Sequence, residues 1–214
     1  TMTEGKHPKH DFLIERIAFF SDAVFAIAIT LMAIEIHPPH VNRGDTEAVV
    51  WEKFKELLPQ FLGLLVSFWL IGSVWLRHHQ LFKYVDNFDL GFMAINLWLL
   101  FTIILYPFST AFLFNSIFYG AVTKLQVYFY LGVPLASSLI LYRMYKTVNK
   151  KHLRGTADVN FRKAVFGQGA MVISFMLAIL WVIIMPLQWH PLGYSFLAAG
   201  PLMSAIYNKK FSNK

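Results

Sequence analysis

Long apolar blocks that are nearly free of charge constrain this chain more than any other feature of its sequence. An α-helix needs about 20 predominantly apolar residues to cross a hydrocarbon layer of about 30 Å. The blocks lack the alternation of polar and apolar residues that is typical of a half-buried strand, so we expect helices. We predict an all-α integral membrane protein with one domain over residues 1–214 and six membrane-spanning helices, at about 12–36, 57–76, 90–114, 120–142, 164–187 and 189–207.

The composition agrees with a membrane location and excludes some chemistry. Hydrophobic residues make up 57% of the chain and charged residues 14%, with a mean hydropathy of +0.51. A soluble domain carries about 25% charged residues. The chain has no Cys, which excludes disulfides and thiolate metal sites. Its net charge of +7 comes from short basic runs between apolar blocks, without a nucleic-acid-binding motif. We therefore expect membrane lipid as a partner, and no nucleic acid.

The distribution of basic residues predicts the orientation of the chain. With six spans and the N-terminus inside, 15 of the 19 Lys and Arg residues fall on the inner side and 4 on the outer side. Basic residues favour the cytoplasmic side of a membrane. We therefore predict that both termini are cytoplasmic.

The first block carries four charged residues, Glu15, Arg16, Asp22 and Glu35, of which Asp22 lies deepest. A charge inside a span costs at least about 2.5–3.5 kcal/mol, so Asp22 is a candidate functional residue. Arg16 is six residues from Asp22, and the two are therefore not neighbours on one helix. Asp22 either forms a polar clamp to another helix or relays protons. The clamp is favoured because no other acid is available in a span to pass a proton on.

A second polar group ends the second block at the same expected membrane level. It includes Trp75, His78 and His79. Adjacent histidines could bind a metal ion, but a zinc site needs three or four converging ligands. No further His or acidic cluster lies near them, so we predict hydrogen-bonded side chains and no metal site.

The first block also carries an apolar stripe. At about 100° per residue, Phe20, Ile27, Leu31 and Ile34 fall within roughly 40° of one line, with Thr30 beside it. The stripe could face lipid or pack against another helix. Alternatively, it could face a central symmetry axis, where apolar rings gate ions by dewetting. The sequence alone leaves both interpretations open.

The residues Arg16 to Thr30 (RIAFFSDAVFAIAIT) resemble the Phe-Ser-Asp signature of the transmembrane protein 175 potassium channel family. The resemblance continues through Trp75–His79, through Asn96–Leu100, and through the Pro107–Thr110 end of the third block. Six spans in about 200 residues are similar to the prokaryotic members. The sequence has no TVGYG-like filter and no re-entrant pore loop, as the resemblance implies.

The resemblance implies a homotetramer in the cell inner (plasma) membrane that conducts K⁺ passively and with modest selectivity. The first helix of each subunit would line the pore. The implied constriction consists of Ile27, Leu31 and Ile34, with the Thr30 hydroxyl available to a passing ion. The implied structural polar network consists of Arg16, Ser21, Asp22, Trp75 and His79, with His78 as an alternative to His79. No cofactor is expected beyond the permeant K⁺.

Other function classes remain open at this point. A secondary transporter of a small ion or solute is the main alternative, although it would need a midplane site with broken helices. An enzyme is not predicted, because only Asp22 with His78 and His79 approaches a catalytic cluster. A membrane scaffold without transport would also have this hydropathy pattern.

Overall fold

The structure, a computed structural model, describes residues 8–86, 89–117, 120–152, 159–186, 195, 200–203, 206 and 209. Within these residues, five helical segments are long and apolar enough to cross a membrane. They are Phe12–Ile34, Glu47–Phe82, Leu90–Ile117, Lys124–Lys150 and Val159–Ile184. Most of the sixth predicted span, 189–207, lies outside the described residues. The chain is therefore an all-helical protein with at least five candidate spans.

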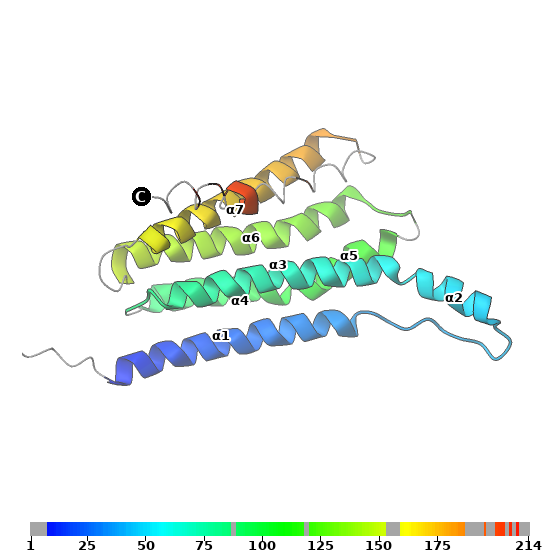
Figure 1. The fold of residues 1–214 in the computed structure, drawn as a ribbon, viewed down its shortest axis with the longest axis horizontal. Helices are drawn as coiled ribbons and strands as arrows, with labels where there is room; N and C mark the ends of the chain where they lie inside the picture. Colours follow the sequence, from blue (N-terminus) through cyan, green and yellow to red (C-terminus); the bar gives the residue numbers. More distant parts are fainter. Residues whose placement is uncertain are drawn as a thin grey trace, which may run out of the picture.

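The helices form an elongated bundle in which they run roughly side by side (Figure 1). In chain order they are α1 (Pro8–Ile34), α2 (Glu47–Lys55), α3 (Leu58–Phe82), α4 (Leu90–Ile104), α5 (Tyr106–Ile117), α6 (Lys124–Thr147), the π-helical turn η1 (Val148–His152) and α7 (Val159–Ile184). Helix α1 packs on α3, α4 and α5, whereas α7 packs on α6. Helices α1 and α7 therefore occupy opposite edges of the bundle (Figure 1).

The third predicted span, 90–114, is two helices rather than one. Helix α4 ends at Ile104 and α5 begins at Tyr106, with a tight turn in which the Leu105 amide donates to the Thr102 carbonyl at 3.2 Å. Pro107 explains the break, because proline has no N–H to donate and its ring clashes with the carbonyl four residues earlier. A buried proline thus divides an otherwise continuous apolar block.

A short helix, α2, precedes the second span in a segment that the sequence analysis treated as an outer loop. The Thr46 hydroxyl caps it by accepting a hydrogen bond from the Val49 amide at 3.4 Å. Lys53 in this helix forms an ion pair with Asp45 at 2.6 Å and donates to the His40 carbonyl at 2.9 Å. Hydrogen bonds from Lys53 and from the Asn42 amide hold the pKa of Asp45 below its usual value. These bonds fix the connection between α1 and α3.

Buried hydroxyl groups join the central helices. Ser67 of α3 lies 2.7 Å from the Thr110 hydroxyl of α5 and 3.2 Å from the Tyr130 hydroxyl of α6. The Tyr106 hydroxyl lies 2.9 Å from that of Ser137. In an apolar surrounding, such pairs satisfy groups that would otherwise be costly to bury. Helices α3, α5 and α6 therefore form the fixed centre of the bundle.

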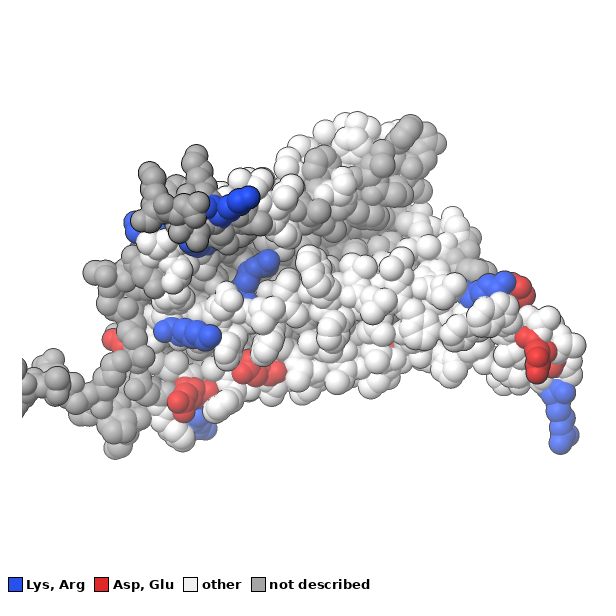
Figure 2. Space-filling view, in the orientation of Figure 1, with Lys and Arg blue, Asp and Glu red and all other residues white. Residues whose placement is uncertain are grey.

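Charged side chains gather toward the two ends of the molecule. On the face shown in Figure 2, the middle of the bundle is almost free of charged side chains. Basic residues lie at the end where α1, α4 and α7 begin and α3 and α6 finish, namely Arg77, Lys83, Arg143, Lys146, Arg162 and Lys163. This pattern is typical of a protein that crosses a membrane, with an apolar band between polar ends.

Candidate functional site: a polar clamp behind an apolar stripe

A chain of hydrogen bonds ties α1 to α3 and α4. The Asn96 side-chain amide of α4 donates to the Ser21 hydroxyl of α1 at 3.0 Å, and Ser21 in turn donates to the Ile17 carbonyl at 2.8 Å. The His78 Nε2 of α3 lies 2.8 Å from the Asn96 Oδ1. All three side chains are buried. Because the amide oxygen only accepts, the His78 Nε2 carries the hydrogen in this arrangement.

Aromatic rings surround His78 on both sides. The centroid of the Phe25 ring lies 5.5 Å from that of His78, and the Phe82 ring lies 4.6 Å away. These rings keep water from the imidazole, which strengthens its bond to Asn96 and raises the cost of breaking it. The end of α3 that carries His78 is therefore held against α1 by both packing and hydrogen bonding.

Asp22, next to Ser21, makes a second link between α1 and α3. The Trp75 indole N–H donates to Asp22 Oδ1 at 2.8 Å, and both side chains are half-buried. The His79 ring lies 5.8 Å from the Trp75 ring, but His79 is exposed. Of the two adjacent histidines, His78 therefore joins the buried polar chain, and the exposed His79 ring lies tilted beside that of Trp75. We call Ser21, Asp22, Trp75, His78 and Asn96 the polar clamp.

Arg16 lies apart from the polar clamp in the single chain. Its side chain is exposed, and its guanidinium lies 5.9 Å from the centre of the Phe12 ring. The structure does not bring it to Asp22. The resemblance implied a role for Arg16 in the network, and within one subunit that role has no contact to support it.

The apolar stripe lies on the side of α1 that no other helix among the described residues covers. The exposed fractions are 56% for Ile27, 41% for Leu31 and 68% for Ile34. Phe25, Ala28 and Met32 are buried and face the bundle. The Thr30 hydroxyl donates to the Ile27 carbonyl at 2.8 Å, and its side chain is exposed. Since a hydroxyl oxygen has two lone pairs, Thr30 can still present an acceptor to a cation.

Comparison with known proteins identifies the family. The family model described as the endosomal/lysosomal potassium channel TMEM175 matches residues 16–107. A curated potassium channel of Chamaesiphon minutus is 31% identical over 191 residues, which cover 86% of this chain and 90% of that protein. The chain belongs to the TMEM175 family. The matched region holds both the polar clamp and the apolar stripe.

Further similarities extend the TMEM175 match. A curated potassium channel of Streptomyces collinus is 39% identical over 98 residues, covering 46% of each chain. Among solved structures, a crystal structure of a lysosomal potassium-selective channel TMEM175 homolog from Chamaesiphon minutus has a TM-score of 0.68 and 28% identity. The structural match covers 94% of this chain and 98% of the chain in the crystal structure. The TMEM175 fold therefore extends beyond the region matched by the family model.

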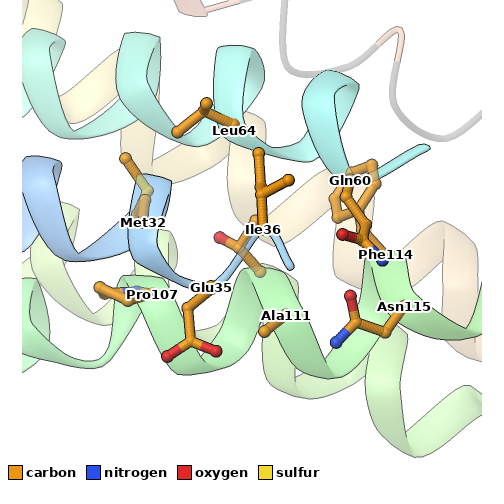
Figure 3. Close-up of a pocket in the computed structure, with 10 residues that line it drawn as sticks. Met32, Glu35, Ile36, Gln60, Leu64, Pro107, Ala111, Phe114 and Asn115 are labelled. Atoms are coloured by element: carbon orange, nitrogen blue, oxygen red, sulfur yellow. The ribbon is translucent and has the colours of Figure 1, made fainter. Parts of the chain in front are cut away.

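A small pocket with some polar residues in its wall lies where the stripe ends (Figure 3). It lies between α1, α3 and α5 and has a volume of about 10 Å³, the room of about one water molecule. Glu35, Gln60 and Asn115 are polar residues in its wall (Figure 3). Gln60 Oε1 is buried there without a hydrogen-bond partner among the described residues. Because Glu35 directly follows Ile34, a carboxylate lies at the C-terminal end of the stripe.

Two members of this site were missed or left unassigned by the sequence analysis. Asn96 was noted only as part of the family resemblance, although it is the centre of the clamp. A lone amide in an uncharged block was the available signal, because an amide in hydrocarbon requires partners. Glu35 was not assigned a role. Across the described ranges, no group of His, Cys, Asp and Glu side chains is arranged to hold a metal ion.

Proposed function

We propose that this TMEM175 family member conducts K⁺ passively across a membrane through a pore lined by α1. The observation that carries the proposal is the exposed stripe of Ile27, Leu31 and Ile34 on a helix whose other face is clamped to the bundle. A single α1 cannot enclose a path, so we propose a homotetramer with four stripes around a central axis. The relatives described as potassium channels support this assignment.

The proposed pore works by dehydration rather than by charge neutralisation. Ile34 lies seven residues after Ile27, or about 10 Å further along the helix. Four copies of each would form successive apolar rings, and their width and wetting would decide whether ions pass. The rings offer no charge to a passing ion, so the preference for K⁺ over Na⁺ is modest. Thr30 would provide an oxygen between the first two rings.

The polar clamp has a positioning role in this proposal. Successive residues of an α-helix are about 100° apart, so a rotation of α1 by one residue would move Ile27 away from the axis. Hydrogen bonds from Asn96 to Ser21 and from Trp75 to Asp22 resist this rotation. Arg16, which is exposed in one subunit, would find its partner across a subunit boundary.

The charge distribution supports an orientation of the chain in the membrane. We propose that both termini are cytoplasmic and that the protein spans the cell inner (plasma) membrane several times. The basic residues at one end of the bundle support this orientation. In it, Glu35 lies on the outer side, where four carboxylates would attract cations to the pore mouth. The channel would need neither a re-entrant pore loop nor a cofactor.

A potassium flux assay on liposomes tests the pore assignment. Ile27→Asn should raise K⁺ flux several-fold and weaken selectivity, because an amide wets the narrowest apolar ring. Ile183→Asn is the matched control, since Ile183 lies on α7 and has the same 56% exposure as Ile27. Equal flux from wild type and Ile27→Asn, or an equal change in the control, would contradict the proposal.

The same assay separates a channel from a secondary transporter. Passive conduction predicts flux that follows the K⁺ gradient without saturation and needs no second ion gradient. Saturating flux that depends on a proton or Na⁺ gradient would instead favour transport. An absence of flux in every variant would favour a scaffold.

A further inference from the structure

A polar pocket lies at the basic end of the bundle, away from α1. It opens between α3, α6 and α7 and has a volume of about 270 Å³. Its polar lining consists of Arg77, Gln80, Tyr145, Asn160 and Lys163. None of the residues that line it is acidic. We call it the basic pocket.

The two cations of the basic pocket have no anionic partner among the described residues. Arg77 is half-buried, yet its guanidinium forms neither an ion pair nor a side-chain hydrogen bond within the described part of the chain. Lys163 is also half-buried. A cation removed from water is costly unless an anion or several acceptors compensate it. Two such groups in one pocket therefore favour a bound anion.

The pocket is held in shape from two sides. The Tyr145 hydroxyl donates to the Arg77 carbonyl at 2.8 Å, which fixes α6 against α3 beside the pocket. Asn160 lies in the first turn of α7, which begins at Val159. The first turn of a helix carries a partial positive charge, which adds to the charges of Arg77 and Lys163.

We propose that the basic pocket binds a phosphate group. The planar guanidinium of Arg77 can donate two parallel hydrogen bonds to phosphate oxygens, and Lys163 adds a second positive charge. The amides of Gln80 and Asn160 can donate to the remaining oxygens. Basic pockets between membrane helices on the cytoplasmic side suit anionic lipid headgroups. Since α7 forms an edge of the bundle, lipid can reach this position (Figure 1).

Thermal unfolding of the purified full chain in dodecyl maltoside tests the site. One set of samples contains mixed micelles with phosphatidylglycerol, with phosphatidylcholine as the neutral lipid control. A second set contains inorganic phosphate, with sodium chloride at equal ionic strength as the control. A ligand that binds the folded state but not the unfolded state raises the unfolding temperature, and the rise grows as the ligand concentration exceeds its dissociation constant. A rise with phosphatidylglycerol alone identifies a lipid headgroup, and a rise with inorganic phosphate identifies the free anion.

Matched variants assign the effect to the pocket. Arg77→Gln and Lys163→Gln should each weaken the apparent affinity at least about 10-fold, the loss of one charge-assisted contact of roughly 1.4 kcal/mol. Arg143→Gln and Lys83→Gln remove the same charges from exposed positions at the same end of the bundle and should leave the affinity unchanged. Lys163→Gln keeps the test valid if Arg77→Gln fails to fold. No rise with either probe, or equal losses in the controls, would overturn the proposal.

Discussion

At the scale of single residues, Asn96 holds the polar clamp together. It donates to Ser21 and accepts from His78, so it satisfies buried groups on two other helices. Asn96→Leu keeps a similar volume but leaves the His78 N–H without an acceptor. An unsatisfied buried donor costs about 1–3 kcal/mol. We expect a lower unfolding temperature in detergent for this variant.

Asn115→Leu is the matched control for that measurement. Asn115 is exposed, so the same substitution should change the unfolding temperature little. If both variants have the same unfolding temperature as the wild type, Asn96 does not stabilise the fold in the way described.

Asp22 gives a second prediction at this scale, because its two substitutions separate hydrogen bonding from charge. Asp22→Asn retains an oxygen that can accept from the Trp75 indole, whereas Asp22→Ala removes it. If the bond alone matters, the Asn variant should assemble nearly as well as the wild type, and the Ala variant should give less assembled protein by size-exclusion chromatography. Equal damage from both substitutions would show that Asp22 acts through its charge, with Arg16 of another subunit as the candidate partner.

The sequence predicted which residue types would gather here, but not all of their pairings. Asp22, Trp75 and the two histidines were chosen because polar groups are costly in apolar helices, whereas Ser21 was implied by the family resemblance. His78 and His79 point about 100° apart on α3, so only one of them can face α4. Which one does so depends on the rotation of α3 against α4, and a single sequence does not contain that information.

At the scale of helices, Gly63 controls the contact between α3 and α5. A Cβ atom added at Gly63 would lie 2.5 Å from the Phe114 Cγ, whereas one added at Gly72 of the same helix meets nothing within 4 Å. Gly63→Ala should therefore destabilise the protein by about 1–3 kcal/mol through overpacking. The readout is the unfolding temperature in detergent.

Gly72→Ala serves as the control, because it makes the same change in open space. It should be neutral or stabilising, since alanine favours a helix more than glycine does. The double variant Gly63→Ala/Phe114→Leu should recover part of the loss. Similar stability of the two single variants would contradict this account of the α3–α5 contact.

The predicted spans and the observed helices differ where local chemistry outweighs hydropathy. The block 90–114 is uniformly apolar, so hydropathy alone gives one helix, but Pro107 divides it. Helix α2 was missed because its residues are more polar than a span. The Thr46 cap and the basic residues of its last turn were the signals for it.

At the scale of the whole molecule, the proposed pore depends on how several copies of the chain assemble, and a single sequence does not specify that assembly. The absence of Cys from the chain makes a direct test simple. Leu31→Cys places one thiol on the stripe, and a cationic methanethiosulfonate reagent should then reduce K⁺ flux strongly by adding a fixed positive charge to the path.

Ile183→Cys is the control for this experiment, with its thiol on the opposite edge of the bundle. The reagent should modify it without changing flux. Inhibition of both variants, or of neither despite complete modification measured by mass spectrometry, would exclude α1 as the pore lining. The mass of the assembly in detergent gives an independent value for the number of subunits.

The positions of the hydrogen bonds along α1 have a mechanical consequence. Among the described residues, the side-chain hydrogen bonds that join α1 to its neighbouring helices are made by Ser21 and Asp22. From Asp22 to the C-terminal end of α1, the helix is held by apolar packing. Ile34 lies 12 residues after Asp22, or about 18 Å along the axis. A tilt of about 10° about this anchored level would displace Ile34 by about 3 Å and Ile27 by about 1.3 Å. The part of α1 that carries Ile34 therefore moves farthest in any such tilt, while the level of Ser21 and Asp22 stays nearly in place.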